Sequence, residues 1–202
     1  MTYRPKDAYH RRAKAEGYRA RSAYKLAELD RRYRLLRRGD RVIDLGAWPG
    51  GWLQVAAERV GAEGRVVGVD VVPLERLSTP TVALVDGDVR DPGTIDAVRE
   101  RLGRPADVVL SDVAPKLTGV RATDEARSTE LVEAVLASLP KLLAPGGRFL
   151  AKLFMTADYE RLMGEVRRRF AETTTTRPEA TRRGSSELYA VGLGYSPAPS
   201  GA

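Results

Sequence analysis

The stretch that decides the fold is Arg41-Val-Ile-Asp-Leu-Gly-Ala-Trp-Pro-Gly-Gly-Trp52, in which an apolar run passes into a turn containing Gly46, Gly50 and Gly51. The residues after the turn have a helical pattern. Glycines in such a strand-turn-helix unit let the backbone approach a bound ligand closely. The next apolar run, Arg65-Val-Val-Gly-Val-Asp70, ends in an acid where a ribose-binding carboxylate is expected. The unit therefore predicts a nucleotide-cofactor site.

The spacing of this turn favours one class of cofactor. A dinucleotide-binding turn of the form G-x-G-x-x-G seats a pyrophosphate on the helix N-terminus. Here the order is Asp44-x-Gly46-x-x-Pro49-Gly50-Gly51, which puts a proline where the phosphates would lie. S-adenosylmethionine carries no phosphate and suits the turn better. An ordinary strand-to-helix turn of an α/β protein remains the alternative at this point.

Composition narrows the class of protein. The chain has 202 residues, 43% of them hydrophobic, which is enough for one domain with a sizeable core. It has no cysteine and a single histidine, His10, which argues against a thiolate nucleophile, a cysteine-ligated metal and a Ser-His-Asp mechanism. No apolar run approaches the roughly 20 residues of a membrane span. We expect a soluble, cytoplasmic monomer that binds neither metal nor membrane.

The net charge of +7 is unevenly distributed along the chain. Residues 1–41 contain 14 Lys and Arg against 5 Asp and Glu, a net charge of +9, whereas residues 42–202 contain 20 against 22, a net charge of −2. Four tyrosines are interleaved with the basic residues: Tyr3, Tyr9, Tyr18 and Tyr24. Such a segment can neutralise a nucleic-acid backbone and stack on unpaired bases. We therefore predict a basic RNA-binding extension over residues 1–21, with a solvated basic tail as the alternative.

The order of apolar segments predicts a doubly wound α/β domain over residues 22–195. Its first helix is expected to have Ser22 as N-cap, to end near Gly39, and to bury a stripe of Leu26, Leu29, Tyr33 and Leu36. Nearly continuous apolar segments indicate buried parallel strands at Val42–Leu45, Val66–Asp70, Thr81–Val85, Asp107–Ser111 and Arg148–Phe154. Helical segments lie between them at Trp52–Val60, Thr94–Leu102, Arg127–Leu142 and Asp158–Phe170.

Two further strands, Ala171–Arg177 and Glu187–Leu193, follow the last helix, and the polar link between them favours an antiparallel pair that closes the sheet. The predicted architecture is a Rossmann-like α/β fold with helices on both faces of a seven-stranded, mostly parallel sheet and an antiparallel last strand. Ligands are expected at the carboxyl ends of the strands. Residues 196–202 are predicted to form a flexible tail.

Acidic residues lie at or just past the ends of the predicted strands: Asp44, Asp70, Asp88 and Asp112. Because the carboxyl ends of parallel strands meet at one rim of a sheet, we expect these four carboxylates to lie together there. Asp70 is placed to accept hydrogen bonds from a ribose diol, and Asp88 to meet an adenine amine. Any one of them alone is equally well explained as a turn residue or a helix cap.

Lys152 interrupts an otherwise apolar predicted strand. A buried lysine is costly unless its charge is paired. Asp112, at the end of the neighbouring strand, is the candidate partner, and the pair would leave Lys152 placed to take or steer a proton. A lysine on an edge strand with its amine in water is the alternative. Glu187 taken alone is an ordinary strand-start residue.

Together these motifs resemble those of the FtsJ/RrmJ-type ribosomal RNA ribose 2'-O-methyltransferases over nearly the whole chain. The matching segments are Gly17-Tyr-Arg-Ala-Arg-Ser-Ala-Tyr-Lys-Leu26, Asp44-Leu-Gly-Ala-Trp-Pro-Gly-Gly-Trp52, Ser111-Asp-Val-Ala-Pro115, Leu143-Ala-Pro-Gly-Gly147, Lys152-Leu-Phe154 and Ser186-Glu-Leu-Tyr189. The resemblance implies a catalytic set of Lys25, Asp112, Lys152 and Glu187. It implies cofactor contacts at Gly50, Trp52, Asp70, Asp88 and Asp112, to which the glycine turn adds Gly46. Trp48 departs from the family, which more often has a small residue there.

The resemblance implies transfer of a methyl group from S-adenosylmethionine to a ribose 2'-hydroxyl by in-line attack. Lys152 would accept or orient the hydroxyl proton, and Asp112 would position Lys152. The implied target is a uridine of 23S rRNA in the assembled 50S subunit, with a tRNA anticodon-loop ribose as the alternative substrate. Two rivals from other classes are a noncatalytic RNA-binding ribosome-assembly factor and a nicotinamide-dependent oxidoreductase.

Overall fold

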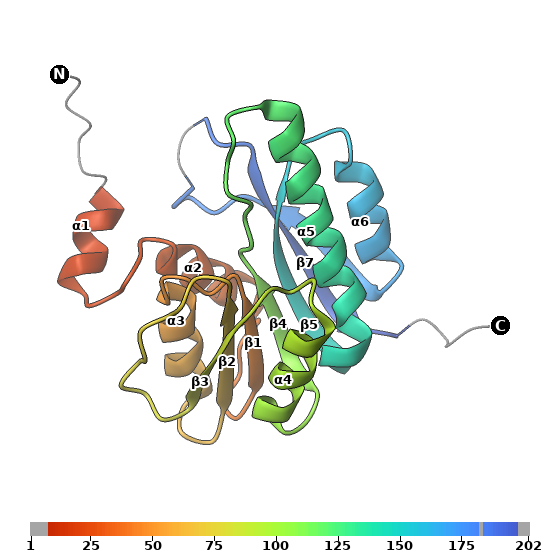
Figure 1. Cartoon of the computed structure of the whole chain (residues 1–202). Coiled ribbons are helices and arrows are strands. Elements are labelled where there is room, and N and C mark those ends of the chain that lie inside the picture. Colours follow the sequence, from red (N-terminus) through yellow and green to blue (C-terminus); the bar gives the residue numbers. More distant parts are fainter. Residues whose placement is uncertain (1–7, 182–183, 198–202) are drawn as a thin grey trace.

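The computed structural model describes residues 8–181 and 184–197 (Figure 1). The helices are α1 (Ala8–Ala15), α2 (Ala23–Tyr33), α3 (Gly51–Val60), α4 (Pro92–Leu102), α5 (Arg121–Leu142) and α6 (Tyr159–Arg167). The strands are β1 (Arg41–Leu45), β2 (Arg65–Asp70), β3 (Val82–Asp86), β4 (Ala106–Ser111), β5 (Leu143–Phe154), β6 (Phe170–Thr176) and β7 (Glu187–Tyr195). The predicted extension and tail lie partly outside the described residues.

The strands form one 7-stranded sheet in the order β3-β2-β1-β4-β5-β7-β6. β1 pairs in parallel with both β2 and β4, and β5 pairs in parallel with β4. β7 is antiparallel to its neighbours β5 and β6. The predicted mostly parallel sheet with an antiparallel last strand is confirmed. Because the strand order reverses between β1 and β4, a ligand crevice is expected at their carboxyl ends.

Helices cover both faces of the sheet, and each face has its own apolar core (Figure 1). One core joins the sheet to α4, α5 and α6, and it contains the stacked rings of Phe149 and Phe170, 5.5 Å apart. The other joins the sheet to α2 and α3, and it contains Leu26, Leu29 and Trp52. Alternate residues of each central strand point to opposite cores, as the twofold period of a strand requires.

The start of α2 agrees with the prediction and its end does not. Ser22 lies at the N-cap position, as predicted, although its backbone angles are helical and its side chain makes no capping hydrogen bond. The helix ends at Tyr33 rather than near Gly39, because Arg34 adopts a left-handed conformation with φ 52° and its N–H donates to the Asp30 carbonyl. Leu36 is nevertheless buried beyond the helix, where its N–H donates to Asp30 Oδ1 at 2.8 Å.

Candidate active site

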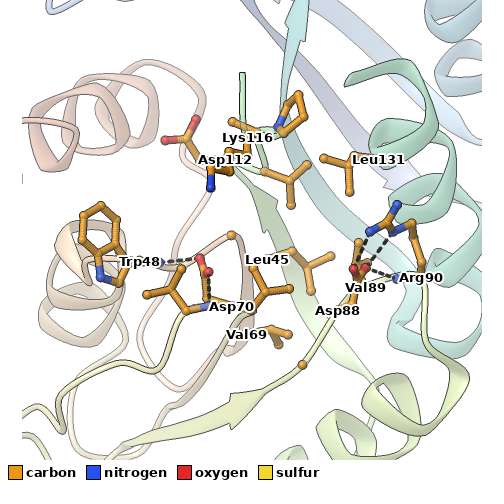
Figure 2. A pocket seen from close by; sticks show the side chains of 17 residues that line it. Leu45, Trp48, Val69, Asp70, Asp88, Val89, Arg90, Asp112, Lys116 and Leu131 are labelled. Carbon is orange, nitrogen blue, oxygen red and sulfur yellow. Dashed lines mark hydrogen bonds and ion pairs between the residues drawn. The ribbon is translucent and has the colours of Figure 1, made fainter. Parts of the chain in front are cut away.

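A cavity of about 510 Å³ opens at the carboxyl ends of β1, β2 and β4 (Figure 2). This volume lies within the range of roughly 300–1,000 Å³ typical of small-molecule sites. Four of the predicted cofactor residues line it: Gly46, Asp70, Asp88 and Asp112. Leu45, Val69 and Leu131 supply apolar wall. The structure therefore puts a cofactor-sized cavity at the rim where the sequence predicted one.

Asp70 ends β2 and holds two segments of backbone beside the cavity. Its Oδ2 accepts a hydrogen bond from the Trp48 N–H at 2.8 Å, and its Oδ1 accepts one from the Val72 N–H at 2.9 Å (Figure 2). Each carboxylate oxygen has a second lone pair, so these bonds fix the group and leave acceptor capacity for ligand hydroxyls. Its position on the wall agrees with the predicted ribose contact, which stays a prediction.

Asp88 lines the same cavity but is paired with an arginine. Its Oδ2 accepts from Arg90 Nη2 at 2.7 Å, and its Oδ1 accepts from Arg90 Nε at 3.0 Å (Figure 2). The hydrogen bonds from the Arg90 side chain lower the pKa of Asp88 below its ordinary value. Asp88 therefore stays ionised and oriented. Sequence reasoning missed Arg90, although its place two residues after an acid in a loop is a usable signal.

Of the cofactor contacts predicted in the glycine turn, Gly46 lines the cavity, whereas Gly50 and Trp52 do not. Gly46 has φ 79°, and a Cβ there would lie 2.7 Å from the Val113 nitrogen, so only glycine fits between the ends of β1 and β4. Trp52 is buried, and its indole N–H donates to the Ser22 carbonyl at 2.9 Å. The tryptophan thus joins α3 to the start of α2.

Asp44 does not lie at the rim with the other three carboxylates. It is fully buried within β1, and neither of its carboxyl oxygens has a hydrogen-bond partner among the described residues. Burial raises the pKa of Asp44 well above its ordinary value, and the nearby charges of Asp112 and Asp70 raise it further. The prediction that four carboxylates share one rim is wrong in this respect, since Asp44 lies inside the sheet beneath them.

Lys152 is paired with Asp112 as predicted. Its Nζ donates to the Asp112 backbone carbonyl at 3.0 Å and lies 3.0 Å from Asp112 Oδ1. The lysine side chain is 6% exposed and the aspartate side chain 20% exposed. β5 lies between β4 and β7, which overturns the alternative of an edge-strand lysine with its amine in water. The buried cation is compensated by the residue at the end of the neighbouring strand.

Lys25 and Glu187 form a second buried pair beside the first. Lys25 Nζ lies 3.0 Å from Glu187 Oε2 and donates to the Tyr189 hydroxyl at 3.3 Å. That hydroxyl in turn donates to Asp112 Oδ1 at 3.2 Å. We call these five residues the charge network: Lys25, Asp112, Lys152, Glu187 and Tyr189. All four predicted catalytic residues are therefore brought together, and Tyr189 links the two ion pairs.

The charge network perturbs the ionisation of its members. Burial raises the pKa of Glu187, but the charges of Lys25 and Lys152 and hydrogen bonds from Lys25 and Ser185 outweigh it, so the net shift is downward. Burial raises the pKa of Tyr189 well above its ordinary value, and the charges of Asp112 and Glu187 add to that. Glu187 therefore stays ionised and Tyr189 stays a hydrogen-bond donor near neutral pH.

Tyr189 is the network residue that sequence reasoning did not single out. It lies two residues after Glu187 on β7 and is the register partner of Lys152 on β5. Alternation along a strand puts residues i and i+2 on one face, so its proximity to Glu187 was a usable signal. Its position opposite Lys152 depends on the register of β5 and β7, which the sequence does not specify.

A smaller cavity of about 260 Å³ adjoins the charge network at the Lys25–Glu187 pair. Arg21, Phe154 and Ser185 complete its lining. The larger cavity contains Asp112, so one cavity meets each ion pair of the network. This arrangement can hold two ligands with buried charges between them.

A comparison with known protein families matches residues 18–195 to the family described as FtsJ-like methyltransferase. The match covers most of the chain, including all five residues of the charge network. The chain belongs to the FtsJ-like methyltransferase family.

Curated relatives of this FtsJ-like methyltransferase share about half of its sequence. A protein of Anaeromyxobacter sp. named ribosomal RNA large subunit methyltransferase E is 50% identical over 192 residues, which is 95% of this chain and 70% of the relative. A protein of the same name from Methanothermobacter thermautotrophicus is 44% identical over 95% of this chain and 91% of the relative. The predicted family is thereby confirmed.

Solved structures show the same fold. One from Plasmodium falciparum, described as a ribosomal RNA methyltransferase, is 27% identical with a TM-score of 0.77, covering 88% of this chain and 98% of that one. The fibrillarin of Aeropyrum pernix, solved with S-adenosyl-L-methionine bound, has a TM-score of 0.63 at 18% identity, covering 85% of this chain and 76% of that one. The predicted Rossmann-like methyltransferase fold is confirmed.

The described part of the basic extension in this FtsJ-like methyltransferase packs its own aromatic rings together. The rings of Tyr9 and Tyr18 each lie 5.7 Å from that of Tyr24, and the Arg12 guanidinium lies 4.8 Å from the Tyr24 ring. Tyr3 lies outside the described residues. The three described rings therefore join α1 to α2, whereas the sequence had suggested rings available to stack on bases.

Over residues 8–181 and 184–197, no cluster of His, Cys, Asp and Glu is arranged to hold a metal ion. Within the same residues, no helix is long and apolar enough to cross a membrane.

Proposed function

We propose that this chain uses S-adenosylmethionine to methylate the 2'-hydroxyl of a ribose, a uridine of 23S rRNA in the large ribosomal subunit. The observation that carries the proposal is the buried charge network, which joins Asp112 at the larger cavity, with its partner Lys152, to Lys25 and Glu187 at the smaller one. The names of the curated relatives support ribosomal RNA as the substrate.

The larger cavity fits S-adenosylmethionine in size and in charge. It is about 510 Å³ in volume and combines apolar walls with the carboxylates of Asp70, Asp88 and Asp112. A sulfonium is a cation, so acidic residues at the cavity favour its binding. Asp70 and Asp88 would hold the adenosine, and Asp112 would lie near the methionine end. When bound, S-adenosylmethionine supplies a methyl group that its sulfonium activates for transfer.

Lys152 would act on the proton of the ribose hydroxyl. An ammonium has three N–H groups, and contacts to Asp112 account for two of them. We assign the third direction to the 2'-hydroxyl: the ammonium form orients the hydroxyl by donating to its oxygen, whereas accepting its proton requires the neutral amine form. Because Asp112 and the strand fix the lysine, much of the rate enhancement would come from orientation, an effect that can supply roughly 7–11 kcal/mol.

Lys25 and Glu187 would hold the target nucleotide at the smaller cavity. Their side chains are only 9% and 18% exposed, so their charges are weakly screened by solvent. Phe154, on the same cavity wall, offers an aromatic face to a nucleobase. The pair would thus set the position of the ribose relative to Lys152.

The basic segment before β1 would bind the RNA backbone. Arg11, Arg12 and Lys14 are exposed on α1, where they can approach phosphates. We accordingly assign residues 1–21 to an RNA-binding extension, 22–195 to the methyltransferase domain and 196–202 to a tail. The protein would act in the cytoplasm as a monomer that needs no metal.

The proposal is tested by transfer of labelled methyl from S-adenosylmethionine to large ribosomal subunits that lack the modification, followed by nuclease mapping of the product. A ribose-methylated uridine in 23S rRNA is expected. Transfer of the labelled methyl group to tRNA instead would show that the substrate is tRNA rather than ribosomal RNA. Tight binding of NAD without binding of S-adenosylmethionine would support an oxidoreductase, and RNA binding without methyl transfer would support an assembly factor.

A further inference from the structure

The Arg19 side chain joins two backbone segments that border the larger cavity. Its Nη1 donates to the Glu75 carbonyl at 2.7 Å and to the Pro49 carbonyl at 3.5 Å, and its Nη2 donates to the Arg76 carbonyl at 3.0 Å. Glu75 and Arg76 belong to the loop between β2 and β3, and Pro49 belongs to the glycine turn. One guanidinium therefore connects the turn to the loop.

The same two segments are connected a second time by Asp70. Its carboxylate accepts hydrogen bonds from the N–H groups of Trp48, in the turn, and Val72, in the loop (Figure 2). Trp48 and Val72 line the larger cavity, whereas Arg19 does not. Asp70 thus holds the two segments at the cavity wall, and Arg19 holds them from outside it.

Arg19 is itself held firmly by α3. Gln54 accepts a hydrogen bond from the Arg19 N–H at 2.8 Å and donates one to the Gly17 carbonyl at 2.9 Å. The neighbouring Tyr18 hydroxyl donates to Glu58 Oε2 at 2.9 Å. The backbone on both sides of Tyr18 is therefore fixed to α3, which gives the guanidinium a rigid base.

The contact depends on the shape of the guanidinium and not only on its positive charge. All three acceptors are neutral carbonyl oxygens, and the planar guanidinium can reach them with two differently directed nitrogen atoms. Lysine has a single nitrogen and cannot span the same acceptors. The side chain also fits closely over the turn, because a Cβ on Gly50 would lie 3.1 Å from Arg19 Cδ.

We propose that Arg19 is a positioning residue for the cofactor, which fixes the turn and the loop so that Trp48, Asp70 and Val72 form a preformed cavity wall. This inference rests on the proposed function, in which the cavity binds S-adenosylmethionine. Without the guanidinium, binding of the cofactor would have to order the loop as well, so affinity would fall.

The test is calorimetric titration of the full chain and its variants with S-adenosylmethionine. Arg19→Lys keeps the charge and should raise the Kd about tenfold, as expected for the loss of one or two hydrogen bonds. In methyl transfer it should raise the KM for the cofactor and leave kcat within about twofold. The matched control is Arg65→Lys, since Arg65 is exposed and its side chain has no hydrogen bond or ion pair to the described residues. The control should bind like the unchanged chain.

A second variant guards against loss of folding. Gln54→Ala leaves the Arg19 side chain in place but removes the acceptor of its backbone N–H. It should therefore also raise the Kd for S-adenosylmethionine, by a smaller factor than Arg19→Lys. Unchanged binding of S-adenosylmethionine in both Arg19→Lys and Gln54→Ala would overturn the inference. A third variant, Arg19→Ala, tests the charge: weak binding by Arg19→Ala combined with full binding by Arg19→Lys would show that a positive charge suffices, and it would also overturn the inference. If the unchanged chain itself fails to bind S-adenosylmethionine, the proposed function fails, and the inference fails with it.

Discussion

The charge network and the wall of the larger cavity are both built around carboxylates, but they differ in burial and in partners. Lys25 and Lys152 have side chains 9% and 6% exposed, and both are held by side chains from distant parts of the chain. On the cavity wall, Trp48 is 58% exposed, and the side chain of Arg90, the partner of Asp88, is 48% exposed. The charge network is preorganised, whereas the wall is open to a ligand.

Under the proposed function, this difference gives the two regions different roles. Charges that are buried and already paired need little reorganisation when a reaction occurs between them, so they suit catalysis. Half-exposed groups suit recognition, because a ligand can replace water at them. Variants of Lys152, which does not line the larger cavity, should therefore lower turnover more than cofactor affinity, and variants of Asp70 and Trp48 on the wall should do the reverse.

The largest effect is expected from Lys152→Ala. In the proposed mechanism this lysine accepts or orients the hydroxyl proton, so its loss should lower kcat about 10³-fold, within the range for general acid-base catalysis. Cofactor affinity, measured by calorimetry, should change by less than about threefold, since Lys152 does not line the larger cavity. The control is Lys141→Ala, at the exposed end of α5. Full methyl transfer by Lys152→Ala would remove the lysine from the mechanism.

The next effect in size is expected on the cavity wall, from Asp70→Asn. The amide cannot accept hydrogen bonds at both of its terminal atoms, so one backbone contact and part of the ligand contact are lost. The Kd for S-adenosylmethionine should rise about 30-fold, with kcat at saturation changed far less. Asp86→Asn is the matched control, because Asp86 is the register partner of Asp70 on β3 but is exposed and does not line the larger cavity. Equal effects of the two substitutions would contradict the assignment of Asp70.

A smaller effect on stability is expected from Glu187→Gln. The pKa of Glu187 is lowered in the folded protein, so its charge stabilises the fold above the ordinary glutamate pKa of 4.5, and this stabilisation is lost as the pH falls through the lowered value. At pH 7 the variant should be less stable by about 1–2 kcal/mol, because Lys25 loses its charged partner.

Denaturant unfolding at a series of pH values measures this difference. The gap between the unchanged chain and Glu187→Gln should shrink below pH 4.5. Glu172→Gln, on the exposed face of the neighbouring strand β6, serves as control and should show no such gap. A gap that is independent of pH would mean that the Glu187 charge does not stabilise the charge network.

The smallest effect is expected from Trp48→Ala. The indole is mostly exposed, so its removal takes away only part of an apolar wall, and the Kd for S-adenosylmethionine should rise about threefold. Leu117→Ala, an exposed apolar residue outside the cavity lining, should leave the Kd unchanged. A tenfold or larger rise for Trp48→Ala would show that the exposed wall contributes more than its burial suggests, and it would narrow the contrast between the two regions.

The candidate site was predictable where local sequence controls geometry. Gly46 and Asp70 follow directly from a strand-turn-helix unit, and Asp112 follows from the end of a neighbouring strand. Trp52 shows the limit of such reasoning, because the same turn directs its ring into the core on the α2 side rather than to the cavity wall. Asp44 shows the same limit. It lies one residue before the end of β1, and its carboxylate is buried inside the sheet rather than at the rim.

The sequence by itself determined the alternation of strands and helices, the glycine turn, the family and the concentration of positive charge before β1. These properties depend on residue type and on short spacings, which remain the same whatever the chain folds against. Only the tertiary structure decided that Lys25 contacts Glu187, 162 residues away, and that it also donates to the Tyr189 hydroxyl. The contact of Arg19 with the Glu75 carbonyl likewise depends on the tertiary structure. Strand periodicity fixes the face on which a residue lies, but strand order and register fix its neighbours, and these depend on packing across the whole sheet.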